Sequence, residues 1–230
     1  MKCVAPAGLS LGEYTALVVG GAMKFEDALE LVVLRGRAMQ DAAEASVGTM
    51  VALLGADEEA AMKCVAFGTE NGGGEVLVAA NFNAPGQVVL SGGPAACAKA
   101  AEFAKEELKL KAIPLDVAGA FHSPLMAPAA ERLKEALEAT EVVAPRVPVM
   151  SNVTGLPHDG EPASIRQRLV EQLTNSVRWA DCVVALREKE EAVGATWVEL
   201  APGKTLSGMM KKIDRKLPVV NYSEPPAETS

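Results

Sequence analysis

The chain has 230 residues, enough for one large domain or for a domain with a smaller insert. Hydrophobic residues make up 49% of the chain and aromatic residues only 4%, which predicts a globular core built from aliphatic side chains. The formal net charge of −8 argues against nucleic acid as a partner, and an acidic partner would need a local basic patch.

No apolar run is long enough for a membrane-spanning helix, so we expect no membrane partner. The N-terminus shows neither a signal-peptide nor a transit-peptide pattern. The cysteines form no CxxC pair and have no neighbouring histidine, which predicts buried thiols in a reducing compartment and no bound metal. They are Cys3, Cys64, Cys97 and Cys182.

A short turn near the N-terminus is the first candidate functional element. Gly8-Leu9-Ser10-Leu11-Gly12 has the pattern Gly-x-Ser-x-Gly, between an apolar run at 4–7 and a helix-forming run. In a strand–turn–helix elbow the glycines leave room beside the serine, and the helix N-terminus favours negative charge on an attacked carbonyl oxygen. We therefore interpret Ser10 as a nucleophile; an ordinary Gly/Ser turn is the alternative.

Apolar residues recur at helical spacing after this turn and predict a helix over 25–45. Arg35 lies on it, where an arginine is ordinarily solvated or salt-bridged. An elbow so close to the start also leads us to expect that strands which normally precede it in an open α/β sheet are missing.

The middle of the chain predicts a βαββαβ order, which is the ferredoxin-like unit. A continuous α/β domain with an irregular middle is the alternative. The expected strands are 49–54, 76–80, 87–90 and 110–115, and the expected helices are 57–67, capped by Asp57, and 94–107.

His122 follows this unit, in a loop before a helix that we expect to end at Ala139. Catalytic groups are often held in loops at strand ends, and a serine nucleophile needs a base. We interpret His122 as that base, although a loop histidine taken alone is more often structural. His158 lies in a polar turn and is expected to be exposed and inert.

The remaining chain predicts further elements of the main domain. They are strands at 147–151 and 196–200, helices at 162–173 and 179–191, and a turn at 201–208 that leads into a helix. Residues 223–230 read as a disordered tail.

Five ordered blocks of the sequence resemble the malonyl-CoA:acyl carrier protein transacylases. The first, Gly8 to Leu17, resembles the family's Gly-His-Ser-Leu-Gly-Glu-Tyr-Thr-Ala-Leu, with Leu9 in place of the histidine. The others are 34–40, 81–89, 117–126 and 201–208, where Ala201 stands at a glycine position. The resemblance extends over nearly the whole chain.

The resemblance implies roles for particular residues. Ser10 would be the nucleophile and His122 its base, oriented by the main-chain carbonyl of Gln172. The Leu11 N–H would be one hydrogen-bond donor to the oxyanion. In the family a second donor comes from a glutamine motif, and this sequence does not contain that motif. Arg35 would bind the malonyl carboxylate, and the other substrate-binding residues would be Asn81, Asn83, Leu9, Met39 and Phe121.

The resemblance also implies the architecture. We expect an α/β-hydrolase-like domain with an open parallel sheet, made of residues 1–46 and 117–222 with its N-terminal part missing. A ferredoxin-like subdomain, 47–116, would be inserted in it, and 223–230 would form the tail.

The expected activity is transfer of malonyl from malonyl-CoA to the phosphopantetheine thiol of acyl carrier protein, through an acyl-serine, for fatty acid synthesis. We expect no permanently bound cofactor and a monomer in a bacterial cytoplasm or a plastid stroma. Two alternatives remain. One is a serine acyl hydrolase or thioesterase, and the other is an inactive truncated homologue acting as an interaction module.

Overall fold

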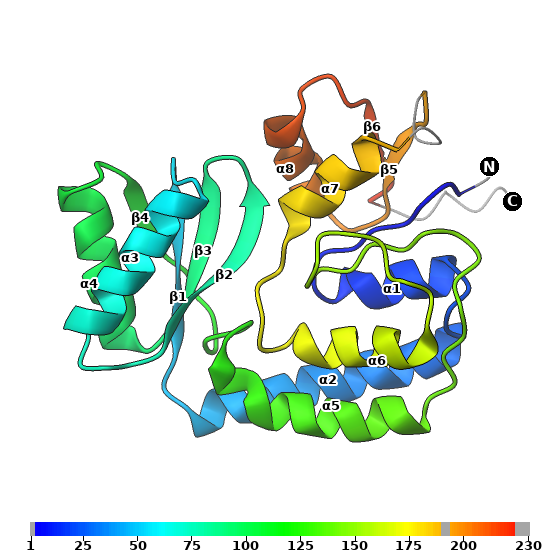
Figure 1. Cartoon of the computed structure of the whole chain (residues 1–230), viewed down its shortest axis with the longest axis horizontal. Helices are drawn as coiled ribbons and strands as arrows, with labels where there is room; N and C mark the ends of the chain where they lie inside the picture. Colours follow the sequence, from blue (N-terminus) through cyan, green and yellow to red (C-terminus); the bar gives the residue numbers. More distant parts are fainter. Residues whose placement is uncertain (1–2, 190–193, 224–230) are drawn as a thin grey trace, which may run out of the picture.

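The computed structural model describes residues 3–189 and 194–223, which form two groups of elements with separate cores (Figure 1). One group is a four-stranded sheet with two helices. The other consists of helices around the N-terminal turn, together with a two-stranded sheet near the C-terminus.

The four-stranded sheet is antiparallel, with the strand order β2-β3-β1-β4. Helices α3 and α4 pack on each other and against the sheet, and Asp57 caps α3 by accepting a hydrogen bond from the Ala60 N–H at 2.8 Å. All six predicted elements of this unit are present, because each has its own local signal. They are β1 (Thr49–Leu54), α3 (Glu58–Asn71), β2 (Leu77–Ala84), β3 (Gln87–Gly92), α4 (Pro94–Glu106) and β4 (Lys111–Pro114).

The second group is largely helical. The long helix α2 (Phe25–Ala45) packs along α5 (Ala127–Ala139) and contacts α1 (Gly12–Val19). Fully buried leucines from α1, α5 and α6 fill the space between these helices and form the core that supports the N-terminal turn. The other helices are the 3₁₀ turn η1 (Pro124–Met126), α6 (Pro162–Glu171), α7 (Trp179–Arg187) and α8 (Thr205–Ile213).

The expected open parallel sheet is the main difference from the sequence prediction. Within 3–189 and 194–223, the only parallel strand pair is β5 (Trp197–Glu199) with β6 (Val219–Asn221). The apolar run at 4–7, which a strand–turn–helix elbow would make a strand, and the predicted strand at 147–151 form no strand, although the Met150 N–H donates to the Pro6 carbonyl at 3.3 Å. Pro6 and Pro148 carry no N–H, so neither stretch can donate a full ladder of hydrogen bonds.

Some sequence predictions are wrong or lie outside the described residues. Cys64, Cys97 and Cys182 are buried as expected, but Cys3 is exposed, so the prediction of a buried thiol is wrong for that residue. The predicted tail lies almost wholly outside the described residues. The helix predicted over 179–191 ends earlier than expected, at Arg187, and residues 188–189 form a turn and a bend. No helix in the described ranges is long and apolar enough to span a membrane.

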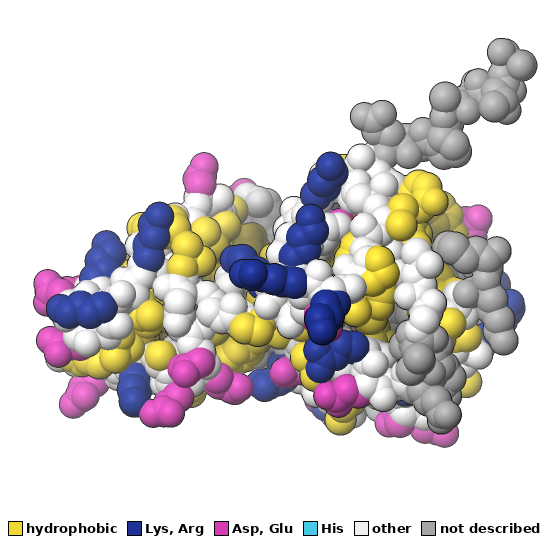
Figure 2. Space-filling model, turned by 90° about the horizontal axis from the view of Figure 1, so that it is seen from above, with side chains coloured by type: hydrophobic (Ala, Val, Ile, Leu, Met, Phe, Trp, Pro, Cys, Tyr) yellow, Lys and Arg dark blue, Asp and Glu magenta, His cyan; other side chains and the backbone are white. Residues whose placement is uncertain are grey.

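Charge is unevenly distributed over the surface. Figure 2 shows Lys and Arg side chains gathered over α8, although the chain as a whole has a net charge of −8. Five exposed basic residues lie on α8 or within three residues of its ends: Lys204, Lys211, Lys212, Arg215 and Lys216. A local basic patch of the kind that an acidic partner would need is therefore present.

Candidate active site

The N-terminal turn has the geometry of a sharp elbow. Ser10 has φ of +52°, in the left-handed region that a non-glycine residue rarely occupies. A Cβ on Gly8 would lie 1.9 Å from the backbone carbon of Gly12, whereas a Cβ on Gly12 would meet nothing within 4 Å. The sequence interpretation that both glycines make room is therefore right for Gly8 alone. The Ser10 N–H donates to Asn152 Oδ1 at 2.6 Å, which holds the strained residue in place.

Ser10 and His122 are in hydrogen-bond contact, with Oγ 2.8 Å from Nε2. The other ring nitrogen, Nδ1, lies 2.7 Å from the main-chain carbonyl oxygen of Gln172. Because a carbonyl oxygen can only accept, Nδ1 carries the proton and Nε2 is free to accept the one on the Ser10 hydroxyl. The ring is thus held in the tautomer that a general base needs.

Burial of His122 lowers its pKa to about 4. The hydrogen bond to the Gln172 carbonyl works against this shift, and the nearby Arg35 guanidinium adds to it. The imidazole is therefore neutral at neutral pH and able to take a proton. His122 has φ of +56°, so its loop is strained like the elbow, and Ser91 Oγ anchors that loop by donating to the Phe121 carbonyl at 2.6 Å.

Arg35 is not the solvated helix residue that is usual for arginine. It is 4% exposed on α2, and its Nη2 donates to Ser10 Oγ at 2.8 Å and to Gln172 Oε1 at 3.0 Å. The guanidinium lies 5.8 Å from the centre of the Tyr14 ring. Burial lowers the pKa of Arg35, and the charge of Glu13 opposes that shift. A buried cation thus lies directly beside the serine hydroxyl.

The amides of the elbow are mostly used by the turn itself. The Gly12 N–H donates to the Leu9 carbonyl and the Glu13 N–H to the Ser10 carbonyl. The Leu11 N–H finds no acceptor among the residues that the structure describes. It therefore remains available at the helix N-terminus, beside Ser10.

The other predicted substrate-binding residues lie on several different elements, and all of them are buried or partly buried. Leu9 and Phe121 directly precede Ser10 and His122, and both are partly buried. Met39 is buried on α2, one helical turn after Arg35. The remaining two, Asn81 and Asn83, are buried on β2, and Asn83 Oδ1 has no hydrogen-bond partner within the described ranges.

A family model described as "Acyl transferase domain" matches residues 4–219. The chain belongs to this acyl transferase family. The malonyl CoA-acyl carrier protein transacylase of Bacillus subtilis is 44% identical over 95% of this chain and 67% of its own length. The Escherichia coli K12 protein of the same name is 39% identical over 96% of this chain and 69% of its own.

Solved structures agree with this assignment. A malonyl CoA-acyl carrier protein transacylase from Clostridium perfringens superposes with a TM-score of 0.88 at 35% identity, over 98% of this chain and 69% of that one. A malonyl-transacylase in complex with its type II PKS acyl-carrier protein gives 0.86 at 35% identity, over 98% of this chain and 71% of that one. The mixed α/β fold of this acyl transferase therefore matches theirs.

Sequence reasoning missed a second layer of polar residues beneath the elbow. Glu13, Asn152 and His158 are connected by hydrogen bonds, and the prediction that His158 is exposed is wrong. The His158 side chain is 0% exposed, with Nε2 2.9 Å from Glu13 Oε1, because the turn folds back onto α1. A glutamate within the apolar run of α1 was the available signal, since a buried carboxylate needs a partner.

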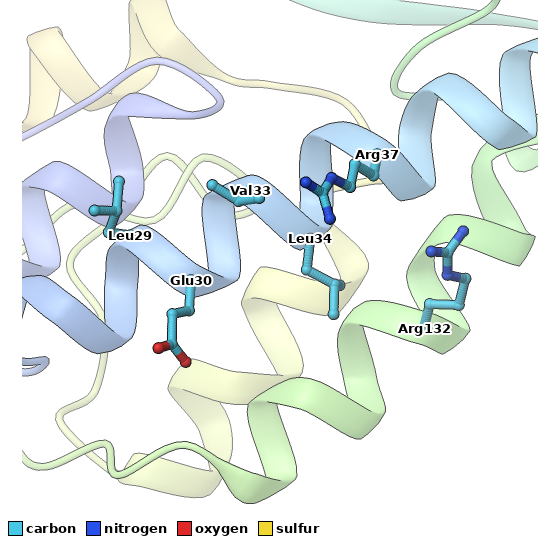
Figure 3. Close-up of a pocket in the computed structure, with 6 residues that line it drawn as sticks. All are labelled: Leu29, Glu30, Val33, Leu34, Arg37 and Arg132. Carbon is cyan, nitrogen blue, oxygen red and sulfur yellow. The ribbon is translucent and has the colours of Figure 1, made fainter.

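The groove in Figure 3 is separate from this site. It lies along the outer face of α2, with Leu29, Val33 and Arg37 on that helix and Arg132 on α5. Arg132 on α5 forms an ion pair with Asp41 on α2, at 2.5 Å. Neither Ser10 nor His122 lines it. In the described ranges no cluster of three or more His, Cys, Asp or Glu side chains could hold a metal ion.

Proposed function

We propose that this acyl transferase moves a malonyl group from malonyl-CoA to the phosphopantetheine thiol of acyl carrier protein. One observation carries the proposal: the His122 imidazole and the Arg35 guanidinium both contact Ser10 Oγ, each at 2.8 Å. A serine hydroxyl with a neutral base on one side and a buried cation on the other suits a nucleophile whose acyl group carries a carboxylate. The relatives named as malonyl transacylases support this assignment.

In the first half-reaction, His122 Nε2 takes the Ser10 proton while Oγ attacks the thioester carbonyl. The Leu11 N–H stabilises the oxyanion of the tetrahedral intermediate. When the C–S bond breaks, the proton on His122 passes to the leaving coenzyme A thiolate. The product of this step is malonyl-Ser10 and free coenzyme A.

In the second half-reaction, the carrier-protein thiol gives its proton to His122 and attacks the acyl-serine carbonyl. The C–O bond to Ser10 breaks, and Oγ recovers the proton from His122. The two half-reactions share one base and one oxyanion donor, and no separate acid is needed. The Gln172 carbonyl keeps the ring in the required tautomer throughout both steps.

Arg35 would provide selectivity for the malonyl group. Its planar guanidinium can grip a carboxylate with two parallel hydrogen bonds, and its contact with Ser10 Oγ puts it within reach of an acyl group on that oxygen. Leu9, Met39 and Phe121 would provide apolar surface for the substrate, and Asn81 and Asn83 polar contacts. The orphaned Oδ1 of Asn83 supports such a contact.

We also propose the finer division of the fold. Residues 47–116 would be a ferredoxin-like subdomain, which the strand order β2-β3-β1-β4 with two helices supports. Residues 1–46 and 117–222 would be the α/β-hydrolase-like part. That the protein acts in fatty acid synthesis, as a monomer, in a bacterial cytoplasm or a plastid stroma stays a prediction.

The test is intact-mass measurement after mixing the chain with malonyl-CoA, with and without phosphopantetheinylated acyl carrier protein. We expect a malonyl adduct that persists in buffer and clears when carrier protein is added. An adduct that clears equally fast in buffer would identify a hydrolase, and the absence of any adduct would favour an interaction module.

A further inference from the structure

A fully buried carboxylate lies on α1, three residues after Ser10. Glu13 accepts hydrogen bonds from His158 Nε2 (2.9 Å), from Gln172 Nε2 (2.6 Å) and from the Asn152 backbone N–H (3.1 Å). A buried charge is tolerated only where it is paired and hydrogen-bonded. These three donors therefore keep the carboxylate in place.

The carboxylate selects one orientation of the Gln172 side-chain amide. In that orientation Nε2 donates to Glu13 and to the Ser10 carbonyl (3.0 Å), while Oε1 accepts from Arg35 Nη2 (3.0 Å). A half-turn of the amide would set its NH₂ group against the guanidinium and its oxygen against the carboxylate, both unfavourable. Glu13 thus makes Gln172 an acceptor for Arg35.

Two hydrogen-bonded routes lead from Gln172 to Ser10 Oγ. One uses the side-chain amide and Arg35, and the other uses the main-chain carbonyl and His122. Only the first depends on how the amide is oriented. A substitution at Glu13 should therefore alter the position of the Arg35 guanidinium more than the position of the His122 ring.

His158 is at the far end of the first route. Its ring is buried, and its other nitrogen, Nδ1, has no hydrogen-bond partner among the described residues, so Nε2 to Glu13 is the one polar contact found for the ring. The backbone N–H of His158 donates to the Val149 carbonyl at 2.9 Å, which fixes the turn that carries the ring. Without this donor, Glu13 would keep only two.

We infer that Glu13 and His158 are positioning residues for substrate selection: they hold the Gln172 amide so that Arg35 is aimed at the carboxylate of the acyl group. Neither touches the reacting atoms. The inference rests on the proposed function, since it concerns recognition of the malonyl carboxylate. It extends the selectivity machinery from Arg35 to the buried Glu13–His158 pair beneath the elbow.

The test compares His158→Leu, which cannot donate, with His158→Gln, whose amide can. The readout is kcat/KM for acyl-serine formation with malonyl-CoA and with acetyl-CoA, which has no carboxylate. For His158→Leu we expect a loss of about 10-fold for malonyl-CoA, as for a lost hydrogen bond to a charged group, and little change for acetyl-CoA. His158→Gln should recover most of that loss.

Three further variants make the result interpretable. Arg35→Ala sets the full size of the change in malonyl-to-acetyl ratio. Glu13→Gln keeps the shape of the side chain but removes its charge. It should lower the malonyl-to-acetyl ratio at least as much as His158→Leu does. If His158→Leu does not fold, the ratio measured for Glu13→Gln tests the inference in its place. Asp57→Ala removes the cap of α3, outside the network, and should leave the ratio unchanged.

The inference is overturned if Arg35→Ala changes the ratio but His158→Leu and Glu13→Gln slow both substrates equally, because the pair is then only structural. An unchanged ratio in Arg35→Ala would overturn it together with the role proposed for Arg35. In that case an intact adduct on Ser10 would still leave the acyl-transfer chemistry standing.

Discussion

His122 lies buried between Ser10 and Gln172, and burial lowers its pKa to about 4. A histidine in water is half protonated near pH 6.5, but this one should stay neutral over the whole range from pH 8 to pH 5. We therefore expect the rate of malonyl-serine formation to be flat over that range. Quenched intact-mass measurements at each pH would check this, and a rate that halves near pH 6.5 would contradict it.

The same shift affects stability, in a direction that can be worked out. Below pH 6.5 the unfolded chain binds a proton at this histidine that the folded chain does not bind until about pH 4. The free energy of unfolding should therefore fall as the pH falls from 6.5 towards 4, by about 2 kcal/mol at pH 5 from this group. Urea unfolding at pH 7 and pH 5 should show a smaller drop for His122→Gln than for the unmodified chain.

The sequence pointed to several residues of the candidate site but not to the layer beneath them. Ser10, His122 and Arg35 are residue types with clear chemistry in recognisable surroundings, and the structure brings them into contact. Glu13 and Asn152 are 139 positions apart, and nothing local to either says that they meet. Such contacts are set by tertiary packing, so periodicity and motifs cannot reveal them.

The elbow is the element on which the site depends, and its two glycines should behave differently. In Gly8→Ala the new Cβ would lie 1.9 Å from the Gly12 carbonyl carbon and oxygen, so the turn must open. We expect a loss of at least about 2 kcal/mol in the free energy of unfolding, and loss of acyl-serine formation.

Gly12→Ala is the matched control for this prediction. Its Cβ enters open space at the start of α1, where alanine favours the helix by up to about 1 kcal/mol over glycine. Chemical denaturation should find it as stable as the unmodified chain or slightly more stable. Equal destabilisation by both substitutions would contradict the packing that we describe.

Helices and strands that have a capping residue, a turn or a clear periodicity in their own sequence were predicted well. Strands that exist only through pairing with a distant segment were not. Helix α2 and the unit from β1 to β4 follow from periodicity, a capping aspartate and the turn-forming pair Pro85-Gly86, which lies between β2 and β3. The stretches at 4–7 and 147–151 are apolar enough for strands, but each contains a proline and pairs too little to form one. Strand β6 was missed because three residues after Pro218 carry almost no pattern.

At the scale of the whole molecule, the candidate site lies where the two groups of elements meet. Ser10, Arg35 and Gln172 come from the helical group, while His122 is in the loop that follows β4. Ser91 on β3 anchors that loop, and the Phe82 N–H on β2 donates to the Val177 carbonyl at 2.9 Å. The distance between His122 and Ser10 therefore depends on how the four-stranded sheet packs against the helical group.

The most direct test of an acyl-serine mechanism at Ser10 is peptide mapping of the adduct formed with malonyl-CoA. The account predicts that the malonyl group is found on the peptide containing Ser10, that Ser10→Ala forms no adduct, and that His122→Ala forms it about 10² to 10⁴ times more slowly. A malonyl group on any other residue, or an adduct that persists in Ser10→Ala, would contradict it.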